Sequence, residues 1–385
     1  MVQLRAPSAR RTTIALLAML LVAALAGCDA IAPVDPGDPA PDPAPTAEAP
    51  DDASEAPGDD PSETDEPAPT DPEPEPEEPS DPAEPQEPGG TLPDDFNLSG
   101  NLGAHDPTML RASDGTYVVY STHNGLEART SPDLGQFSGN GAALPDGASW
   151  AAQFMDGDPR AMWAPDASFH DGTYYLYYSA STFGSNTSAI GLATSDSGLP
   201  GSWTDQGEVI SSSPGDNFNA IDPSLTVDAE GNWWLTFGSF WDGIKMIAID
   251  PMTGKRAGNE ILSLASRGGG AIEGPDMIEH DGAYYLFVAF DRCCAGTDST
   301  YRVMVGRSDS PTGPFVDRSG QPLLDGGGTE ILATSGNRIG PGGADVYSEG
   351  GDDVLVYHYY DGAGNGAVRL AIDRIEWVDG WPEIN

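Results

Sequence analysis

One hairpin phrase recurs five times along the chain. Its copies read SDGTYVVYST, HDGTYYLYYSAS, AEGNWWLTFGSF, HDGAYYLFVAF and GGDDVLVYHYY. Most contain an Asp-Gly or Glu-Gly turn between alternating aromatic and β-branched residues, a pattern that strongly predicts a β-hairpin. When the copies are aligned on Gly115, Gly172, Gly231, Gly282 and Asp353, they lie 57, 59, 51 and 71 residues apart. A fold built from this chain must therefore place five similar hairpins in equivalent positions.

Each hairpin is followed by a further segment with the pattern of a strand. These segments read GLEARTS, AIGLATS, IKMIAID, RVMVGRS and AVRLAID, and no convincing amphipathic helix lies between the repeats. A unit of about four strands repeated at this spacing is typical of a β-propeller. The sequence therefore predicts an all-β, five-bladed β-propeller over residues 97–385. A β-sandwich is the alternative, but it would not repeat one hairpin phrase five times.

The first 28 residues have the pattern of an export signal. Three Arg precede an apolar run, Ile14–Ala26, that is too short and too poorly flanked for a stable membrane span. The run ends in Leu-Ala-Gly-Cys28, which resembles the lipobox of bacterial lipoproteins. We expect Cys28 to be acylated, so that the protein is exported and lipid-anchored at the bacterial cell envelope with its folded domain periplasmic or extracellular. An ordinary signal peptide with a chance Cys is the alternative.

Residues 29–96 differ sharply in composition from the rest of the chain. The segment 29–95 contains 23 acidic residues and neither Lys nor Arg, and it is rich in Pro. Such a segment cannot bury enough apolar surface to offset its ordering entropy, and its like charges repel. We expect a disordered, extended tether between a membrane and the folded domain.

The charge of the whole chain excludes some classes of partner. The net charge is −44, and residues 97–385 still carry 38 acidic against 14 basic side chains. Nucleic acid and anionic lipid surfaces repel such a domain. We expect a monomer that contacts the membrane only through its N-terminal anchor.

The first strand of each predicted blade carries acidic residues. These strands read HDPTML, WAPDASF, AIDPSL, AIEGPDM and GGADVY. Because the first strands of a propeller line its channel, Asp106, Asp222 and Glu273 should point toward one mouth, with Glu273 in the slot that Trp163 holds in another blade. Glycosidic bond cleavage needs one carboxylate as base or nucleophile and one protonated carboxyl as acid. A third carboxylate can raise the pKa of the acid by repulsion. Strand capping or Ca²⁺ binding is the alternative role for each Asp.

The whole of residues 97–385 resembles glycoside hydrolase family 43, and most closely its endo-1,5-α-L-arabinanases. The resemblance rests on HDPTML, MWAPDASFHDGTYYLYYSASTFGSNTSAIGLATS, NAIDPSL, FGSFWDGIKM, AIEGPDM, DRCCAGTDSTYRVMVGRS and VYHYYDG. It implies that Asp106 is the general base, that Glu273 is the general acid, and that Asp222 raises the pKa of the acid and orients the substrate. It also implies inversion of configuration, for which the base and acid carboxyl groups stand roughly 6.5–9.5 Å apart.

The resemblance implies further site residues as well. His358 corresponds to a residue facing a central ion, usually calcium, with water-rich coordination. The implied substrate contacts are Gly184, Asn219, Ala220, Ile221, Asp222, Ser239, Phe240 and Trp241, and Trp163 is a candidate for stacking on a sugar.

Two features leave alternatives open. The adjacent Cys293 and Cys294 could form a vicinal disulfide or remain two thiols. Gly343 and Ala344 stand where family members tend to have polar residues, which leaves the lip of the fifth blade undefined.

The expected activity is endo-acting hydrolysis of α-1,5-linked arabinan. The alternatives are an exo-acting arabinofuranosidase or β-xylosidase on the same scaffold, or a non-catalytic carbohydrate-binding propeller, although a binding protein need not retain all three carboxylates.

Overall fold

The computed structural model describes residues 91–93 and 95–384 of the chain. The predicted signal peptide, Cys28 and nearly all of the predicted tether lie outside these residues. Within them the structure has 22 strands and three short 3₁₀ helices, η1 (Ala151–Phe154), η2 (Gly296–Asp298) and η3 (Leu323–Asp325). No helix in this part of the chain is long and apolar enough to cross a membrane.

The strands form five sheets that follow one another along the chain. Blade one contains β2 (Thr108–Arg111), β3 (Tyr117–Ser121), β4 (Glu127–Ser131) and β5 (Gln136–Ala142), with the short β1 (Ser99–Gly100) parallel to β5. Blade two contains β6 (Trp163–His170), β7 (Thr173–Ala180), β8 (Ser188–Ser195) and β9 (Thr204–Ser212). Blade three contains β10 (Ser224–Val227), β11 (Trp233–Phe237) and β12 (Ile244–Asp250), which pairs with both β13 (Lys255–Arg256) and β14 (Leu262–Ala265). Blade four contains β15 (Ile272–His280), β16 (Ala283–Phe290), β17 (Arg302–Ser308) and β18 (Thr329–Leu332). Blade five contains β19 (Arg338–Glu349), β20 (Asp352–Asp361), β21 (Ala367–Val378) and β22 (Trp381–Ile384).

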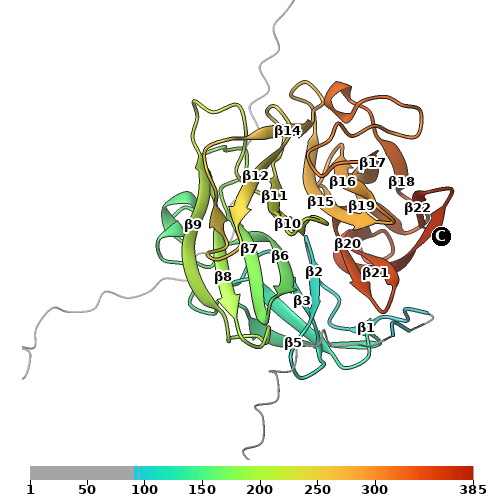
Figure 1. Cartoon of the computed structure of the whole chain (residues 1–385). Helices are drawn as coiled ribbons and strands as arrows, with labels where there is room; N and C mark the ends of the chain where they lie inside the picture. Colours follow the sequence, from blue (N-terminus) through green and yellow to red (C-terminus); the bar gives the residue numbers. More distant parts are fainter. Residues whose placement is uncertain (1–90, 94, 385) are drawn as a thin grey trace, which may run out of the picture. The chain divides into compact units, whose positions relative to one another are not determined.

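The first strands of the blades surround a common axis. Each of β2, β6, β10, β15 and β19 contacts the first strand of the next blade, and β19 contacts β2, which closes the ring (Figure 1). One hydrophobic cluster fills each of the five spaces between neighbouring blades. The predicted five-bladed all-β propeller is confirmed.

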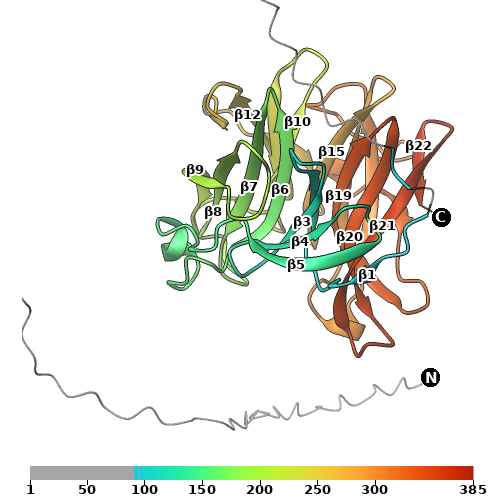
Figure 2. The same ribbon diagram turned by 90° about the horizontal axis from the view of Figure 1, so that it is seen from below.

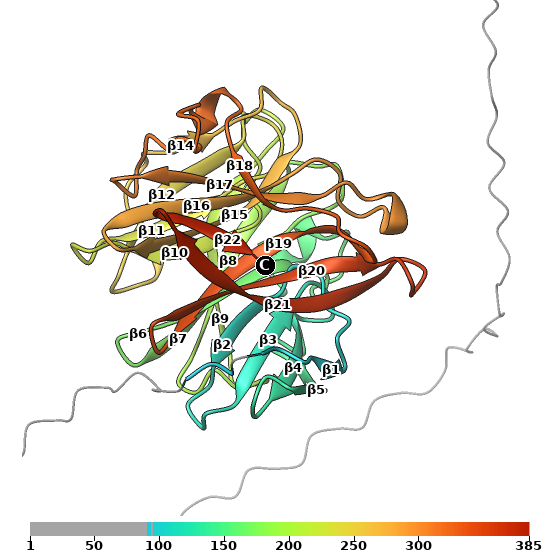
Figure 3. The same ribbon diagram turned by 90° about the vertical axis from the view of Figure 1, so that its right-hand side faces the viewer.

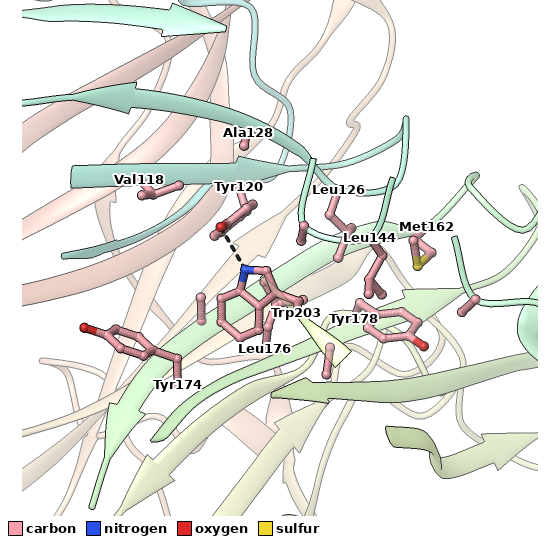
Figure 4. Packing of buried hydrophobic residues seen from close by; sticks show 14 of the residues in the cluster. Val118, Tyr120, Leu126, Ala128, Leu144, Met162, Tyr174, Leu176, Tyr178 and Trp203 are labelled. Atoms are coloured by element: carbon pink, nitrogen blue, oxygen red, sulfur yellow. Dashed lines mark hydrogen bonds between the residues drawn. The ribbon is translucent and has the colours of Figure 1, made fainter. Parts of the chain in front are cut away.

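The cluster between blades one and two illustrates how these spaces are packed. The indole of Trp203 lies among apolar side chains of both blades, including Val118 and Leu176 (Figure 4). Its Nε1–H donates a hydrogen bond to the hydroxyl of Tyr120 over 2.8 Å. A buried indole usually needs such a partner, because an unpaired N–H in an apolar interior is destabilising.

The repeated turns have the geometry that their residues favour. Asp171-Gly172 and Asp281-Gly282 have positive φ at both positions, as a type I′ hairpin turn requires. In blade five, Gly350 and Gly351 form the turn, with φ of 66° and 89°. The alignment of that repeat on Asp353 is therefore displaced by two residues, and Asp353 itself lies inside β20.

Each blade has a residue with left-handed backbone in its first strand or just before it, near the mouth of the channel. The φ values are 46° at Asp106, 37° at Ala164, 56° at Asp222, 54° at Gly274 and 55° at Gly343. In β6, β15 and β19 the pairing register shifts at this point, as in a β-bulge. The five positions are thus structurally equivalent, and the residues directly before them are His105, Trp163, Ile221, Glu273 and Gly342. Glu273 and Trp163 do occupy the same slot, as the sequence predicts.

The remaining acids of the first strands connect neighbouring blades. Asp166 accepts the backbone N–H of Leu225 over 2.9 Å, and Asp276 accepts that of Val346 over 2.8 Å. In the same way Asp345 accepts a backbone N–H from blade one over 3.0 Å. Burial, together with the charge of Asp276, raises the pKa of Asp166 to about 8. These three carboxyl groups tie adjacent first strands together below the mouth of the channel.

The ring closes where blade five meets blade one. In the described part of the chain, these blades share no strand. Instead, Leu92 packs into the cluster between them, and Leu102 accepts a hydrogen bond from the backbone N–H of Leu370 in β21 over 2.7 Å. Arg374 of β21 donates to the carbonyl oxygens of Leu92 and Pro93. The segment before β2 therefore covers this seam, and Figures 2 and 3 show blade one beside blade five.

Candidate active site

One large cleft opens at the mouth of the channel. Its volume is about 1650 Å³, and residues of all five blades line it. Asp106, Asp222 and Glu273 are all among them. Ordinary small-molecule sites measure roughly 300–1,000 Å³, so this cleft has room for a ligand of several sugar units.

Asp106 is held in its ionised form. The turn before β2 places its carboxylate Oδ2 2.7 Å from His105 Nδ1, and the hydroxyl of Thr122 donates to the same oxygen over 2.7 Å. Burial alone would raise the pKa of Asp106, but His105, His358 and Thr122 together lower it well below its usual range. A partly buried carboxylate that stays ionised is available to accept a proton.

The pKa of Glu273 is shifted in the opposite direction from that of Asp106. It is the second residue of β15, and Ser239 donates a hydrogen bond to its Oε2 over 2.8 Å. Burial raises the pKa of Glu273 even though Ser239, Tyr301 and His105 partly counter that effect. A carboxyl group with a raised pKa can keep its proton near neutral pH and donate it as an acid.

Asp222 contacts the segment that carries Glu273. Its Oδ2 accepts the backbone N–H of Gly274, the residue next to Glu273, over 3.1 Å. Burial, followed by the charges of Glu273 and Asp106, raises the pKa of Asp222 well above its usual value. Because Coulomb repulsion is reciprocal, the charge on either carboxylate of this pair favours the protonated form of the other.

The buried hydroxyl of Tyr301 lies among the three carboxyl groups. Burial, and then the charges of Glu273, Asp106 and Asp222, raise the pKa of Tyr301 well above its ordinary value. The hydroxyl thus stays protonated and can donate a hydrogen bond to Glu273. The mouth of the channel therefore combines one ionised carboxylate, a carboxyl pair that favours protonation, and a neutral phenol.

Known proteins resemble this chain in sequence and in fold. A family model described as "Glycosyl hydrolases family 43" matches residues 100–382. The chain belongs to glycosyl hydrolases family 43. The extracellular endo-alpha-(1->5)-L-arabinanase 1 of Bacillus subtilis (strain 168) is 43% identical over 283 residues, which are 72% of this chain and 86% of that protein.

Two relatives of this family 43 hydrolase have solved structures with the same fold. The GH43 endo-arabinanase from Bacillus licheniformis is 44% identical with a TM-score of 0.71, over 75% of this chain and 99% of that one. An exo-1,5-alpha-L-arabinanase from a bovine ruminal metagenomic library is 39% identical, also with a TM-score of 0.71, over 74% of this chain and 99% of that one. The resemblance predicted from the motifs is confirmed at the level of the family.

Most of the predicted substrate contacts of this family 43 hydrolase line the cleft. Those that do are Gly184, Asn219, Ile221, Asp222, Ser239, Phe240, Trp241 and Trp163. Ala220 does not, because its side chain is fully buried in the cluster between blades two and three. The side-chain oxygen of Asn219 is buried and has no hydrogen-bond partner among the described residues, so it is available to a ligand or a water.

His358 lies beneath the cleft of the hydrolase. Its ring is fully buried, and burial together with the charge of His105 lowers the pKa of His358 to about 3. Nδ1 accepts the backbone N–H of Asp106 over 3.1 Å, so the proton of the neutral ring lies on Nε2. Nε2 has no partner among the described residues. Nε2 therefore carries a hydrogen and not a lone pair, so it can donate a hydrogen bond to a water but cannot coordinate a cation directly.

Sequence reasoning missed several residues of the hydrolase site. His105, Thr122, Tyr301 and Tyr360 line the cleft, and Phe183 at its edge is 87% exposed. Only His105 had a signal in the sequence that could have pointed to it, because it occupies the same position in its blade as Glu273 does. Gly343 has a clear reason to be Gly, since a Cβ there would stand 2.6 Å from Asp106 Oδ1. The lip of the fifth blade thus makes room for the carboxylate of Asp106.

Proposed function

We propose that the chain is an endo-acting arabinan hydrolase that cleaves internal α-1,5-L-arabinofuranosidic bonds with inversion of configuration. The observation that carries this proposal is the opposite protonation tendency of Asp106 and Glu273 in one cleft. General acid/base hydrolysis of a glycoside needs such a pair. The names of two relatives, each of which describes an endo-arabinanase, support arabinan as the substrate.

Each carboxyl group has a distinct role in this proposal. The ionised Asp106 removes a proton from water as the water attacks the anomeric carbon. Glu273 donates its proton to the leaving oxygen from the other side of the sugar. The charge of Asp106, and that of Asp222 when it is ionised, disfavours loss of that proton by repulsion. Asp222 also orients the substrate, while Ser239 and Tyr301 fix the carboxyl group of Glu273. Inversion follows if the Asp106 and Glu273 carboxyl groups are roughly 6.5–9.5 Å apart with the water between them.

Exo action is the second candidate. One relative of similar coverage is named an exo-1,5-alpha-L-arabinanase, so the fold and the acids alone do not decide where on the polymer the enzyme cuts. The size of the cleft favours endo action, because a site for terminal units needs less room. A β-xylosidase or a carbohydrate-binding propeller without activity would use the same scaffold.

The products released from linear arabinan distinguish these candidates. Chromatography of samples taken early in the reaction should reveal a ladder of arabino-oligosaccharides. Arabinose as the sole early product would overturn endo action in favour of exo action. Hydrolysis of xylobiose with no action on arabinan would indicate a β-xylosidase, and binding of arabinan without any product would indicate a binding protein.

We also propose that one calcium ion binds at His358 through its hydration shell. The support is the buried Nε2 of His358, which needs a polar partner. When bound, the cation would supply positive charge that favours the ionised form of the neighbouring Asp106. His358 and Asp106 are the residues of this chain that would face the hydrated ion.

Removal of the ion should lower activity without unfolding the propeller. We expect exhaustive chelation to reduce kcat on arabinan, and added calcium to restore it, while circular dichroism stays unchanged. Calorimetric titration of the chelated protein with calcium should detect binding, and the His358→Gln variant should lose it. Full activity in a sample shown by elemental analysis to be free of metal would contradict a functional ion.

The N-terminal residues support an exported, membrane-anchored enzyme. We propose that Cys28 is acylated after cleavage of the signal peptide, and that the part of residues 29–96 before Leu92 then separates the propeller from the membrane. Leu92 and Pro93 themselves contact the propeller, so the end of the expected tether belongs to the folded domain. The word "extracellular" in the name of the Bacillus subtilis relative is consistent with export. An arabinan polymer is too large to enter a cell intact, so an enzyme that shortens it is useful outside.

A further inference from the structure

A disulfide between adjacent residues borders the base side of the cleft. Cys293 and Cys294 are bonded to each other in the loop between β16 and β17, and both line the cleft. The loop belongs to blade four. Its two sulfur atoms nevertheless contact His105 of blade one, because Cys293 Sγ lies 3.8 Å and Cys294 Sγ 3.7 Å from His105 Nε2.

Tyr360 of blade five joins this contact. Its hydroxyl oxygen lies 3.0 Å from His105 Nε2 and 3.6 Å from Cys293 Sγ. The same hydroxyl accepts the backbone N–H of Cys294 over 2.9 Å. Three blades therefore meet at one nitrogen of the His105 ring.

The His105 ring is restrained on its other sides as well. Nδ1 lies 2.7 Å from Asp106 Oδ2, and one face of the ring stacks on His358 with the ring centres 3.9 Å apart. A ring held at both nitrogens and on one face cannot turn without losing several contacts. The carboxylate of Asp106 in turn depends on this ring for one of its two close side-chain partners.

We propose that the Cys293–Cys294 disulfide is a positioning element for the base: it fixes the His105 imidazole, which in turn holds the Asp106 carboxylate in place. The proposal rests on the proposed role of Asp106 in hydrolysis. The disulfide suits this task because a bond between adjacent residues restricts the backbone that carries it. Cys294 has φ of 60°, which non-glycine residues rarely adopt, so the bonded pair holds a loop conformation that two free thiols would not enforce.

Reduction should release this restraint. A dithiol such as dithiothreitol attacks one sulfur atom, and its second thiol then displaces the mixed disulfide. The S–S bond gains two electrons and two protons to give two cysteine thiols, and the reagent becomes a cyclic disulfide. Cys294 is exposed at the cleft, so the reagent can reach it.

The test measures kcat and KM of the full-length enzyme before and after reduction, on linear arabinan and on an aryl α-L-arabinofuranoside if it is accepted. Because small misplacements of reacting groups slow catalysis by up to about 100-fold, we expect kcat to fall roughly 10- to 100-fold. The fall should be similar on both substrates, since the base acts on both, and KM should change little. Reoxidation should restore kcat. The double variant Cys293→Ser/Cys294→Ser should be slow from the start and insensitive to the dithiol, although it retains Cys28.

Tyr360→Phe provides a second variant that keeps the disulfide and the aromatic ring. It should also lower kcat with little change in KM, and near-UV circular dichroism should confirm that it is folded. Unchanged kcat after verified reduction, or in Tyr360→Phe, would overturn the proposal. A rise in KM alone would also overturn it, since the disulfide would then be a wall that touches the sugar. An oxidised wild-type protein without activity would instead refute the proposed function.

Discussion

Replacement of Glu273 by Gln is expected to slow cleavage of linear arabinan by roughly 10²- to 10⁴-fold, the range that general acid catalysis contributes. The leaving sugar alkoxide needs a proton, and Gln cannot supply one. Gln has nearly the shape of Glu and keeps an oxygen that can accept the hydrogen bond from Ser239. An aryl glycoside whose phenol leaves readily should lose much less activity, because its leaving group needs little protonation. The measurement is kcat/KM on both substrates.

Asp106→Asn is the matched control for this prediction. It also replaces a carboxylate by its amide in the same cleft, but it removes the base, which acts on the attacking water whatever the leaving group. The value of kcat/KM should therefore fall to a similar degree on both substrates. Equal losses on the two substrates for Glu273→Gln would contradict its role as the acid. A separation of about 5 Å between the Asp106 and Glu273 carboxyl groups would favour retention of configuration instead.

Replacement of Cys28 by Ser should move nearly all of the enzyme from the membrane fraction to the soluble exported fraction. The acyl chains can be attached only to the thiol of Cys28, and each buried CH₂ contributes about 0.8 kcal/mol to anchoring. The measurement is the distribution of arabinan-hydrolysing activity after cell fractionation.

The double variant Cys293→Ser/Cys294→Ser is the control for this experiment, since it changes Cys to Ser elsewhere in the chain. Its protein, detected with an antibody, should stay with the membranes. If the Cys28→Ser protein also stays there, the lipoprotein interpretation is wrong, and the N-terminal residues serve as an ordinary signal or as a retained segment.

The sequence was sufficient to predict the propeller because its hairpins are local. A turn such as Asp171-Gly172 and the strands beside it lie within a few residues of one another, so their pattern survives in the sequence. The closure of the ring could not be predicted in the same way. Leu92 and Leu102 meet β21 across more than 250 residues, and no local pattern records that contact.

The three acids of the site were predictable because each stands where the first strand of its blade begins: Asp106 and Asp222 hold the left-handed position, and Glu273 stands directly before it. Tyr301 was not predictable, since it reaches the cleft from the loop between β16 and β17. Tyr360 ends the fifth copy of the hairpin phrase, but the other copies end in Thr122, Ser181, Phe240 and Phe290, so no shared residue type marked it. Asp166 and Asp276 show the limit of the same reasoning. They also stand near the start of first strands, but two residues beyond the left-handed position, where the strand directs them to the backbone of the next blade.

The seam between blades five and one is where a force on the proposed tether would act on the propeller. Of the two residues that cover it, Leu92 lies at the end of the segment 29–96 that we expect to connect the propeller to a membrane, and Leu102 lies shortly after that segment. Any pull on the enzyme, from flow or from a bound polymer, would enter the fold at the same residues that hold its ring shut. Arg374 of β21 donates hydrogen bonds to the carbonyl oxygens of Leu92 and Pro93. A force on this segment would therefore pass first to blade five. In the proposed anchored enzyme, the segment that attaches the propeller would also be the segment that closes its ring.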